Sequence, residues 1–130
     1  MTIPKKALIV DDEAHIRMFV KMVLKEVGIE EFLEAGSSKE GIEVYKQEKP
    51  DVIFMDVNMP GIDGIDALDQ LMEHDPDAFV IMLTSVSTRE SVEKAILRGA
   101  SQYIRKDTPK EEMIKILKDT FDPQEEPAES

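Results

Sequence analysis

Several polar or charged side chains in this chain stand where a hydrophobic run stops. Asp11 and Asp12 follow ALIV, Asp56 closes DVIFMD, Thr84 closes FVIMLT and Lys106 closes QYIRK. If the four runs are parallel strands, their carboxyl ends lie at the same edge of one sheet, and these side chains meet there. The sequence therefore predicts one site that combines carboxylates, a hydroxyl and an ammonium group.

Such a site suits phosphoryl transfer that depends on a metal ion. Two carboxylates about 4 Å apart repel by about 1 kcal/mol in water and by about 4 kcal/mol at an effective dielectric of about 20, so a crowded set needs a cation. Mg²⁺ takes oxygen ligands and pairs with phosphate oxygens. An ionised carboxylate beside such a cation and Lys106 can attack phosphorus and form an acyl phosphate. The Thr84 hydroxyl can then donate to a transferring oxygen.

Each residue also has an ordinary structural interpretation. The Asp11–Asp12 pair could cap a helix, and Asp56 could open the polar turn that follows it. Thr84 could begin a helix, and Lys106 could be a surface charge. These interpretations are reasonable singly, but none explains why acids gather at one edge of a parallel sheet. His15 and His74 are not expected to bind metal, and six methionines are expected to fill the core, at positions 18, 22, 55, 72, 82 and 113.

The elements that must position the site alternate between strand and helix. A first helix is predicted from Glu13 to a stop at Gly28, because hydrophobic residues recur at helical spacing: Ile16, Phe19, Val20, Val23, Leu24 and Val27. A weaker, more polar strand follows at Glu31–Glu34, as is typical of a sheet edge.

Three further helix starts are marked by capping residues. Ser37 and Glu40 have the spacing of a capping box, and Ser87 and Glu90 repeat it. The run Thr108-Pro109-Lys110-Glu111 predicts the last helix, with a cap followed by proline and glutamate. With a further helix after Asp56 that ends near His74, five strand–helix units result, and parallel strands require such crossovers. We therefore expect an α/β fold with one domain over residues 1–121 and an acidic, disordered tail over residues 122–130.

Composition excludes several classes of function. A net charge of −12 argues against nucleic acid as a direct partner, because phosphate backbones require a basic surface. The chain has no cysteine, which excludes disulfides and thiolate metal sites. The longest apolar run, Ala78–Leu83, is too short to cross a membrane, and the amino-terminal sequence does not resemble a signal peptide. A cytoplasmic protein is expected.

Taken together, these residues resemble the receiver domain of bacterial two-component response regulators, over about Lys5 to Phe121. The resemblance implies a five-stranded, doubly wound parallel sheet of flavodoxin-like order 2-1-3-4-5 with five helices. It implies that Asp56 is the phosphoacceptor, and that Thr84, its neighbour Ser85 and Lys106 contact the phosphoryl group.

The resemblance also implies a cofactor and a switch. Mg²⁺ would be bound by Asp12, Asp56 and the main-chain carbonyl of Asn58, with Asp11 acting mainly through water. Tyr103 matches the aromatic position that turns inward when the threonine moves toward the phosphoryl group. The chain would catalyse its own phosphorylation and dephosphorylation and would not be an enzyme acting on other molecules.

One residue departs from the family pattern. Receiver domains usually have proline after the lysine, joined by a cis peptide, whereas Asp107 follows Lys106 here. A cis bond without proline costs about 3 kcal/mol or more. We therefore expect either a trans bond with a reshaped loop or a strained cis bond.

The expected function is that of a stand-alone receiver, similar to chemotaxis or phosphorelay regulators. A histidine kinase or a histidine phosphotransfer protein would donate the phosphoryl group. A downstream protein would read the surface formed by the fourth helix, fifth strand and fifth helix, which should carry five basic residues: Arg89, Lys94, Arg98, Arg105 and Lys110.

Three alternative functions share features with this one. A flavodoxin-like electron carrier needs a phosphate loop where this chain has Asp11-Asp12-Glu13, and a haloacid dehalogenase-type phosphatase needs an acid where it has Asn58. A receiver-like interaction module that works without phosphorylation stays open.

Overall fold

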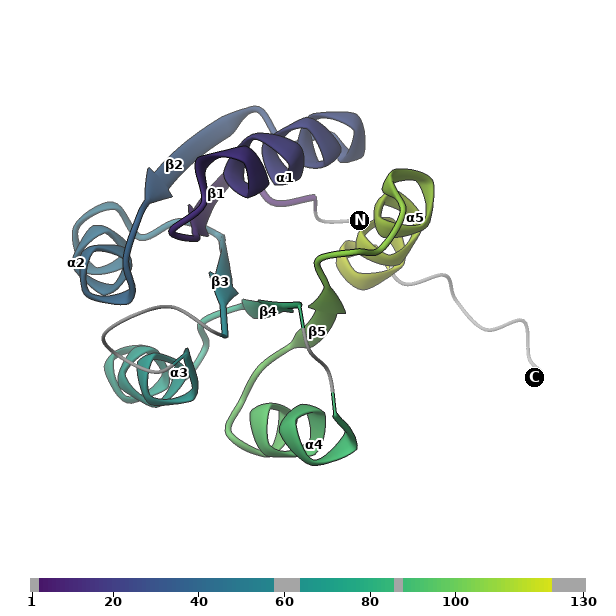
Figure 1. Cartoon of the computed structure of the whole chain (residues 1–130). Helices are drawn as coiled ribbons and strands as arrows, with labels where there is room; N and C mark the ends of the chain where they lie inside the picture. The colour runs from purple at the N-terminus through teal and green to yellow at the C-terminus, as the bar shows by residue number, and fades with distance from the viewer. Residues whose placement is uncertain (1–2, 58–63, 86–87, 123–130) are drawn as a thin grey trace.

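A five-stranded parallel sheet forms the centre of the computed structural model, which describes residues 3–57, 64–85 and 88–122 (Figure 1). The strands follow the predicted hydrophobic runs: β1 (Lys6–Val10), β2 (Glu31–Ala35), β3 (Val52–Asp56), β4 (Val80–Thr84) and β5 (Gln102–Arg105). Their order in the sheet is β2-β1-β3-β4-β5, which confirms the expected fold class.

Within the described residues, five helices cover the two faces of the sheet (Figure 1). Helices α1 (Ala14–Val27) and α5 (Lys110–Phe121) pack on one face, and α2 (Ser38–Glu48), α3 (Gly64–His74) and α4 (Arg89–Leu97) pack on the other. Every residue of β3 and β4 is buried, whereas the edge strand β2 exposes Glu31 and Glu34. The apolar runs are therefore continuous in the middle of the sheet and interrupted at its edge, because only central strands are covered on both faces.

The strand order reverses between β1 and β3, and this reversal brings the predicted site together. Val10 lies beside Met55 in the register of these two strands, so the residues that follow Val10 stand next to Asp56. Asp11 extends the ladder on the other side, because its amide donates to the carbonyl of Ala35 at 3.1 Å. Crevices of this kind at the carboxyl ends of parallel strands are common binding sites.

Two of the predicted helix ends are confirmed. Gly28 ends α1 with a φ of +120°, a left-handed conformation that glycine adopts without strain. The Ser37 hydroxyl accepts the amide of Glu40 at 3.1 Å at the start of α2, and the Glu40 carboxylate accepts the amide of Gly36. The predicted cap of α2 is therefore present, although its second hydrogen bond comes one residue earlier than a capping box requires.

Two predicted helix starts were wrong by one residue. The cap of α4 is Thr88, whose hydroxyl accepts the amide of Ser91, whereas the sequence favoured Ser87, which lies outside the described residues. Helix α5 begins at Lys110 with Pro109 as its N-cap and no side-chain cap, so Thr108 does not cap it. Proline provides the fixed φ that a helix start needs and lacks the amide that would otherwise lose its partner.

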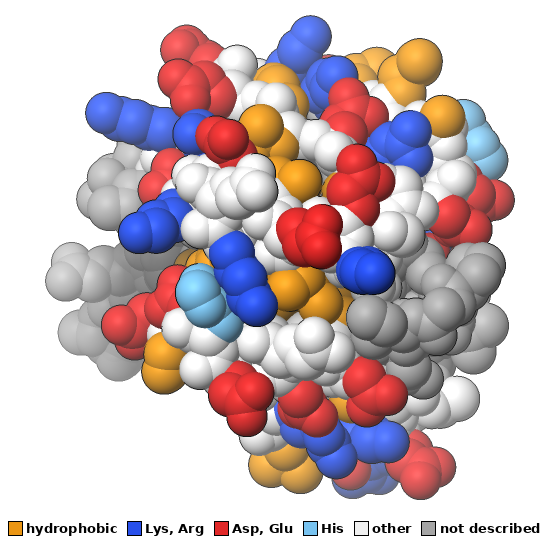
Figure 2. Space-filling model, turned by 90° about the vertical axis from the view of Figure 1, so that its left-hand side faces the viewer, with side chains coloured by type: hydrophobic (Ala, Val, Ile, Leu, Met, Phe, Trp, Pro, Cys, Tyr) orange, Lys and Arg blue, Asp and Glu red, His pale blue; other side chains and the backbone are white. Residues whose placement is uncertain are grey.

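Two methionines do not fill the core as predicted. Met18 is 70% exposed and Met22 is 43% exposed, on the outward side of α1. Figure 2 shows hydrophobic side chains at its upper edge, which is where Figure 1 places α1. No helix within the described residues is long and apolar enough to cross a membrane.

Candidate functional site

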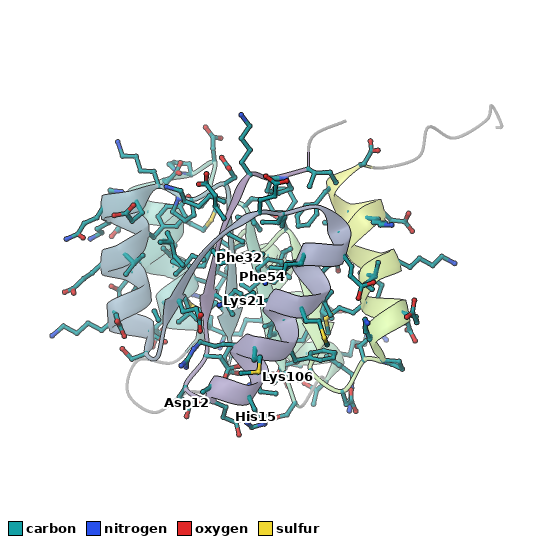
Figure 3. All side chains as sticks on the ribbon, turned by 90° about the horizontal axis from the view of Figure 1, so that it is seen from above. Asp12, His15, Lys21, Phe32, Phe54 and Lys106 are labelled. Carbon is teal, nitrogen blue, oxygen red and sulfur yellow. The ribbon has the colours of Figure 1, made fainter. Side chains whose placement is uncertain are left out.

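The three predicted carboxylates meet at the carboxyl end of the sheet. One oxygen from each of Asp11, Asp12 and Asp56 lies within 4.8 Å of the others. Asp11 is fully buried and Asp56 is 2% exposed, whereas Asp12 faces solvent. Figure 3 shows Asp12 and Lys106 at this end of the molecule, with Phe54 in its middle. Two acids are thus withdrawn from water, and buried carboxylates require a positive partner.

Lys106 supplies that partner. Its ammonium lies 2.7 Å from Asp11 Oδ2, 3.0 Å from Asp56 Oδ2 and 3.7 Å from Glu13 Oε1. Burial alone would lower the pKa of Lys106, but hydrogen bonds and charge from Asp11 and Asp56 outweigh burial, and the net pKa is raised. Lys106 is therefore charged, and it bridges the two buried acids.

Main-chain hydrogen bonds position these side chains. The amide of Lys106 donates to the carbonyl of Thr84 at 2.6 Å, and the amide of Val57 donates to the carbonyl of Leu83 at 2.8 Å. The Asp11 carboxylate accepts the amide of Glu13 through Oδ1 at 2.9 Å and so caps the turn before α1. One oxygen of Asp11 thus closes the turn while the other contacts Lys106. The N-cap of α1 is Glu13, so Asp11 does not cap the helix itself, and its part in the chemistry stays a prediction.

The loop after β5 shows whether the Lys106–Asp107 peptide bond is cis or trans. No cis peptide occurs within the described residues, so the Lys106–Asp107 bond is trans. The Asp107 carboxylate accepts Nε and Nη2 of Arg105, both at 2.9 Å, across the intervening lysine. The amide of Thr108 donates to the carbonyl of Arg105 at 3.2 Å and closes a turn. A reshaped loop with a bidentate ion pair stands where the family pattern has proline.

The remaining predicted residues lie around this cluster. Thr84 is fully buried at the end of β4, and Ser85 is exposed beside it. The hydroxyl of Tyr103 is buried and has no hydrogen-bond partner among the described residues, and its ring packs against the core beneath α2, α3 and α4. Asn58 lies outside the described residues, as do Met59, Pro60 and Gly61.

Arg17 is a residue of this region that sequence reasoning missed. Its Nη1 donates to the main-chain carbonyl of Asp11 at 2.6 Å, and its Nε donates to Glu34 Oε1 at 2.9 Å. Glu34 also pairs with Lys21 at 2.7 Å. From its position in the sequence, Arg17 could be assigned only to one side of a helix. Its contact with Glu34 arises because β1 pairs with β2, which places Glu34 opposite Arg17.

The acidic cluster could hold a metal ion. Its donors are all carboxylate oxygens, which suit hard cations such as Mg²⁺ and do not suit soft ones. Two of the three acids already share one ammonium group, and the exposed Asp12 leaves the cluster open to solvent. The residues present therefore fit Mg²⁺.

The expected basic surface is largely neutralised by acidic partners. Four of its five residues form ion pairs: Arg89 with Glu93, Arg98 with Asp69, Arg105 with Asp107, and Lys110 with Glu26. These pairs offset four of the five positive charges that were expected on this surface. The partners of Arg89 and Arg105 are near in the sequence, whereas the fold brings Asp69 of α3 to Arg98 and Glu26 of α1 to Lys110.

The sequence matches the response regulator receiver domain over residues 7–118, and the chain belongs to this family. The chemotaxis protein CheY of Thermotoga maritima is 37% identical over 113 residues, which cover 87% of this chain and 94% of that protein. CheY of Halobacterium salinarum is 37% identical over 120 residues, covering 90% of this chain and 97% of the relative.

Solved structures agree with this family membership. CheY in the CheX–CheY–BeF3–Mg complex from Borrelia burgdorferi has a TM-score of 0.85 and 27% identity, over 91% of this chain and 90% of that chain. The CheY-like receiver domain protein of Methanospirillum hungatei has a TM-score of 0.81 and 26% identity, over 91% and 94% of the two chains. The chain is thus a CheY-like receiver domain with the flavodoxin-like fold.

Proposed function

We propose that this chain is a single-domain response regulator that accepts a phosphoryl group on Asp56 from the phosphohistidine of a kinase or phosphotransfer protein. The observation that carries the proposal is the position of Lys106 between Asp11 and Asp56, beside an exposed Asp12. The similarity to chemotaxis proteins along most of their length supports a stand-alone regulator that works in the cytoplasm.

In the proposed reaction, a carboxylate oxygen of Asp56 attacks phosphorus. An O–P bond forms, the P–N bond to the donor histidine breaks, and the imidazole leaves with its electron pair. Lys106 neutralises charge on the transferred group, while Thr84 and Ser85 contact its oxygens. Mg²⁺, bound by Asp12, Asp56 and the carbonyl of Asn58, with Asp11 acting mainly through water, would supply further charge neutralisation. Water would later attack the phosphorus at the same centre, break the O–P bond to Asp56, release inorganic phosphate and restore the carboxylate.

Phosphorylation would shift an equilibrium between two conformations and thereby change a surface. Thr84 and Tyr103 would couple the site to the face formed by α4, β5 and α5, where a downstream protein binds. The hydroxyl of Tyr103 is buried and has no hydrogen-bond partner among the described residues. This supports the proposal that the Tyr103 side chain moves to another environment on phosphorylation. The similar Borrelia burgdorferi CheY was crystallised with CheX, which supports a protein partner of this general kind.

Phosphorylation can be measured by intact mass. The protein is incubated with acetyl phosphate and, separately, with phosphoramidate, whose P–N bond resembles that of phosphohistidine, with and without Mg²⁺. We expect a gain of one phosphoryl group that requires Mg²⁺ and is lost in Asp56→Asn. Asp66→Asn is the matched control, because Asp66 is an exposed aspartate on α3, outside the acidic cluster. An adduct that persists in Asp56→Asn would contradict the assignment of the acceptor.

The alternative is a receiver-like module that binds partners without phosphorylation. Failure with both donors and with a phosphorylated histidine kinase, in protein that is folded and binds Mg²⁺, would favour this alternative. Arg105 and Asp107 would then be the first residues to examine, because their pairing replaces the usual proline beside Lys106.

A further inference from the structure

Arg17 lies behind the acidic pair rather than in it. The pair stands on the turn between β1 and α1, and the main-chain carbonyl of Asp11 belongs to the peptide that joins Asp11 to Asp12. Arg17 reaches back from the first turn of α1 and donates Nη1 to this carbonyl at 2.6 Å. Its side chain is 20% exposed, so the contact is largely shielded from solvent. A hydrogen bond from a charged donor is stronger than a neutral one.

The guanidinium is itself fixed from a second side. Its Nε donates to Glu34 Oε1 at 2.9 Å, and the other oxygen of Glu34 lies 2.7 Å from the ammonium of Lys21. The pKa of Glu34 is lowered by its hydrogen bonds to Lys21 and Arg17, so the carboxylate stays charged. Three elements are joined in this way: α1 through Arg17, β2 through Glu34, and the turn after β1 through Asp11.

From this geometry we infer that Arg17 is a positioning residue for the acidic pair, which fixes the Asp11–Asp12 peptide before any metal binds. The inference rests on the proposed function in so far as the pair binds Mg²⁺. Carboxylates that are already oriented lose little conformational freedom when the cation binds, so binding costs less free energy. The outward Asp12 needs such support most, because it is exposed and does not share the contacts that Asp11 makes with Lys106 and Glu13.

Lys21 provides a matched control on the same helix. It pairs with the same Glu34 and carries the same charge as Arg17, but it does not contact the turn. Figure 3 shows Lys21 farther from Asp12 along the molecule, near Phe32, and its ammonium lies 6.0 Å from the centre of that ring. Arg17→Met and Lys21→Met therefore remove one positive charge each, and only Arg17→Met removes a donor to Asp11.

The experiment compares these two variants with the wild type in two measurements. Isothermal titration with Mg²⁺ should show a Kd raised roughly tenfold in Arg17→Met, at the low end of what loss of a supporting hydrogen bond costs at metal sites. In Lys21→Met the Kd should change by less than about twofold, because exposed charges are screened. Arg17→Lys, which keeps the charge with a single donor group, should give an intermediate Kd.

Hydrogen exchange of the metal-free protein is the second measurement. The amide of Glu13, which donates to Asp11 Oδ1, should exchange several-fold faster in Arg17→Met and at the wild-type rate in Lys21→Met. Equal Mg²⁺ affinity in Arg17→Met and wild type, tighter binding in Arg17→Met, or equal changes in both variants would overturn the inference. If Arg17→Met does not fold, Glu34→Gln tests the same claim by removing the anchor of the guanidinium.

The two hypotheses fail in different ways. If the wild-type protein binds no Mg²⁺ and accepts no phosphoryl group, the proposed function fails, and exchange at Glu13 still decides whether Arg17 positions the turn. If the wild type binds Mg²⁺ and the Arg17 variants match it in both measurements, only the positioning role fails.

Discussion

Helices α1 and α4 lie on opposite faces of the same sheet, and they are attached to it very differently. Helix α1 buries Val20, Val23, Leu24 and Val27, and Arg17 adds a hydrogen bond to the main-chain carbonyl of Asp11. Helix α4 is described over all its nine residues, and only Ala95 is buried. Its Leu97 is 86% exposed and its Ile96 is 45% exposed. Figure 2 shows hydrophobic side chains at its lower edge, where Figure 1 places α4.

The difference in burial between α1 and α4 corresponds to two separate requirements of a protein switch. Metal binding and phosphoryl transfer need carboxylates that keep their positions, and a helix with a wide buried face provides a rigid support. A helix that buries little apolar area can shift at a small cost, because regions with few buried contacts open most easily. If the proposed function holds, α1 would support the chemistry and α4 would carry the conformational change. Three measurements test this difference between α1 and α4.

The largest expected effect comes from matched leucine substitutions. Leu24→Ala on α1 should lower the free energy of unfolding by about 2–5 kcal/mol, since Leu24 is fully buried and a cavity would remain. Leu97→Ala on α4 should change it by less than about 0.5 kcal/mol. Urea unfolding followed by circular dichroism measures both. A loss above about 2 kcal/mol in Leu97→Ala would show that α4 is more firmly packed than its exposure indicates.

A smaller effect is expected from removing the cap of α4. Thr88→Ala deletes the hydroxyl that accepts the amide of Ser91, at a typical cost of about 1 kcal/mol. If α4 opens locally, this cost should appear as about fivefold faster hydrogen exchange within α4, with little change in global unfolding. Ser37→Ala is the control on α2, whose buried residues should make the same loss global. Equal losses of global stability in the two variants would count against independent opening of α4.

The smallest effect concerns pH. Glu34 has a pKa below its ordinary value of 4.5, because Lys21 and Arg17 donate to its carboxylate. The contribution of Glu34 to stability is therefore complete above pH 4.5 and is lost as the pH falls through the lowered pKa of the folded state. Glu34→Gln should flatten the acid side of the stability curve, measured by thermal unfolding between about pH 6 and pH 3. Glu93→Gln, on the exposed side of α4, should follow the wild type, and a similar flattening there would remove the contrast.

Much of the fold and of the site could be predicted from the residues alone. Hydrophobic runs of strand length predicted the strands, and helical spacing predicted the buried face of α1, because both patterns depend only on local geometry. Asp11, Asp12, Asp56, Thr84 and Lys106 were predicted to meet, because parallel strands place their carboxyl ends at one edge. The strand order came from the family resemblance, since nothing local decides which strands pair.

Contacts between residues that are distant in the sequence could be learned only from the folded structure. The acids that neutralise Arg98 and Lys110 stand on other helices, and Arg17 meets Glu34 only because β1 pairs with β2. Met18 fits a core by its chemistry, yet it lies on the outer side of α1, since burial depends on what covers a helix. Local patterns thus determined the elements and the chemistry, whereas long-range packing determined which charges meet and which hydrophobic side chains stay exposed.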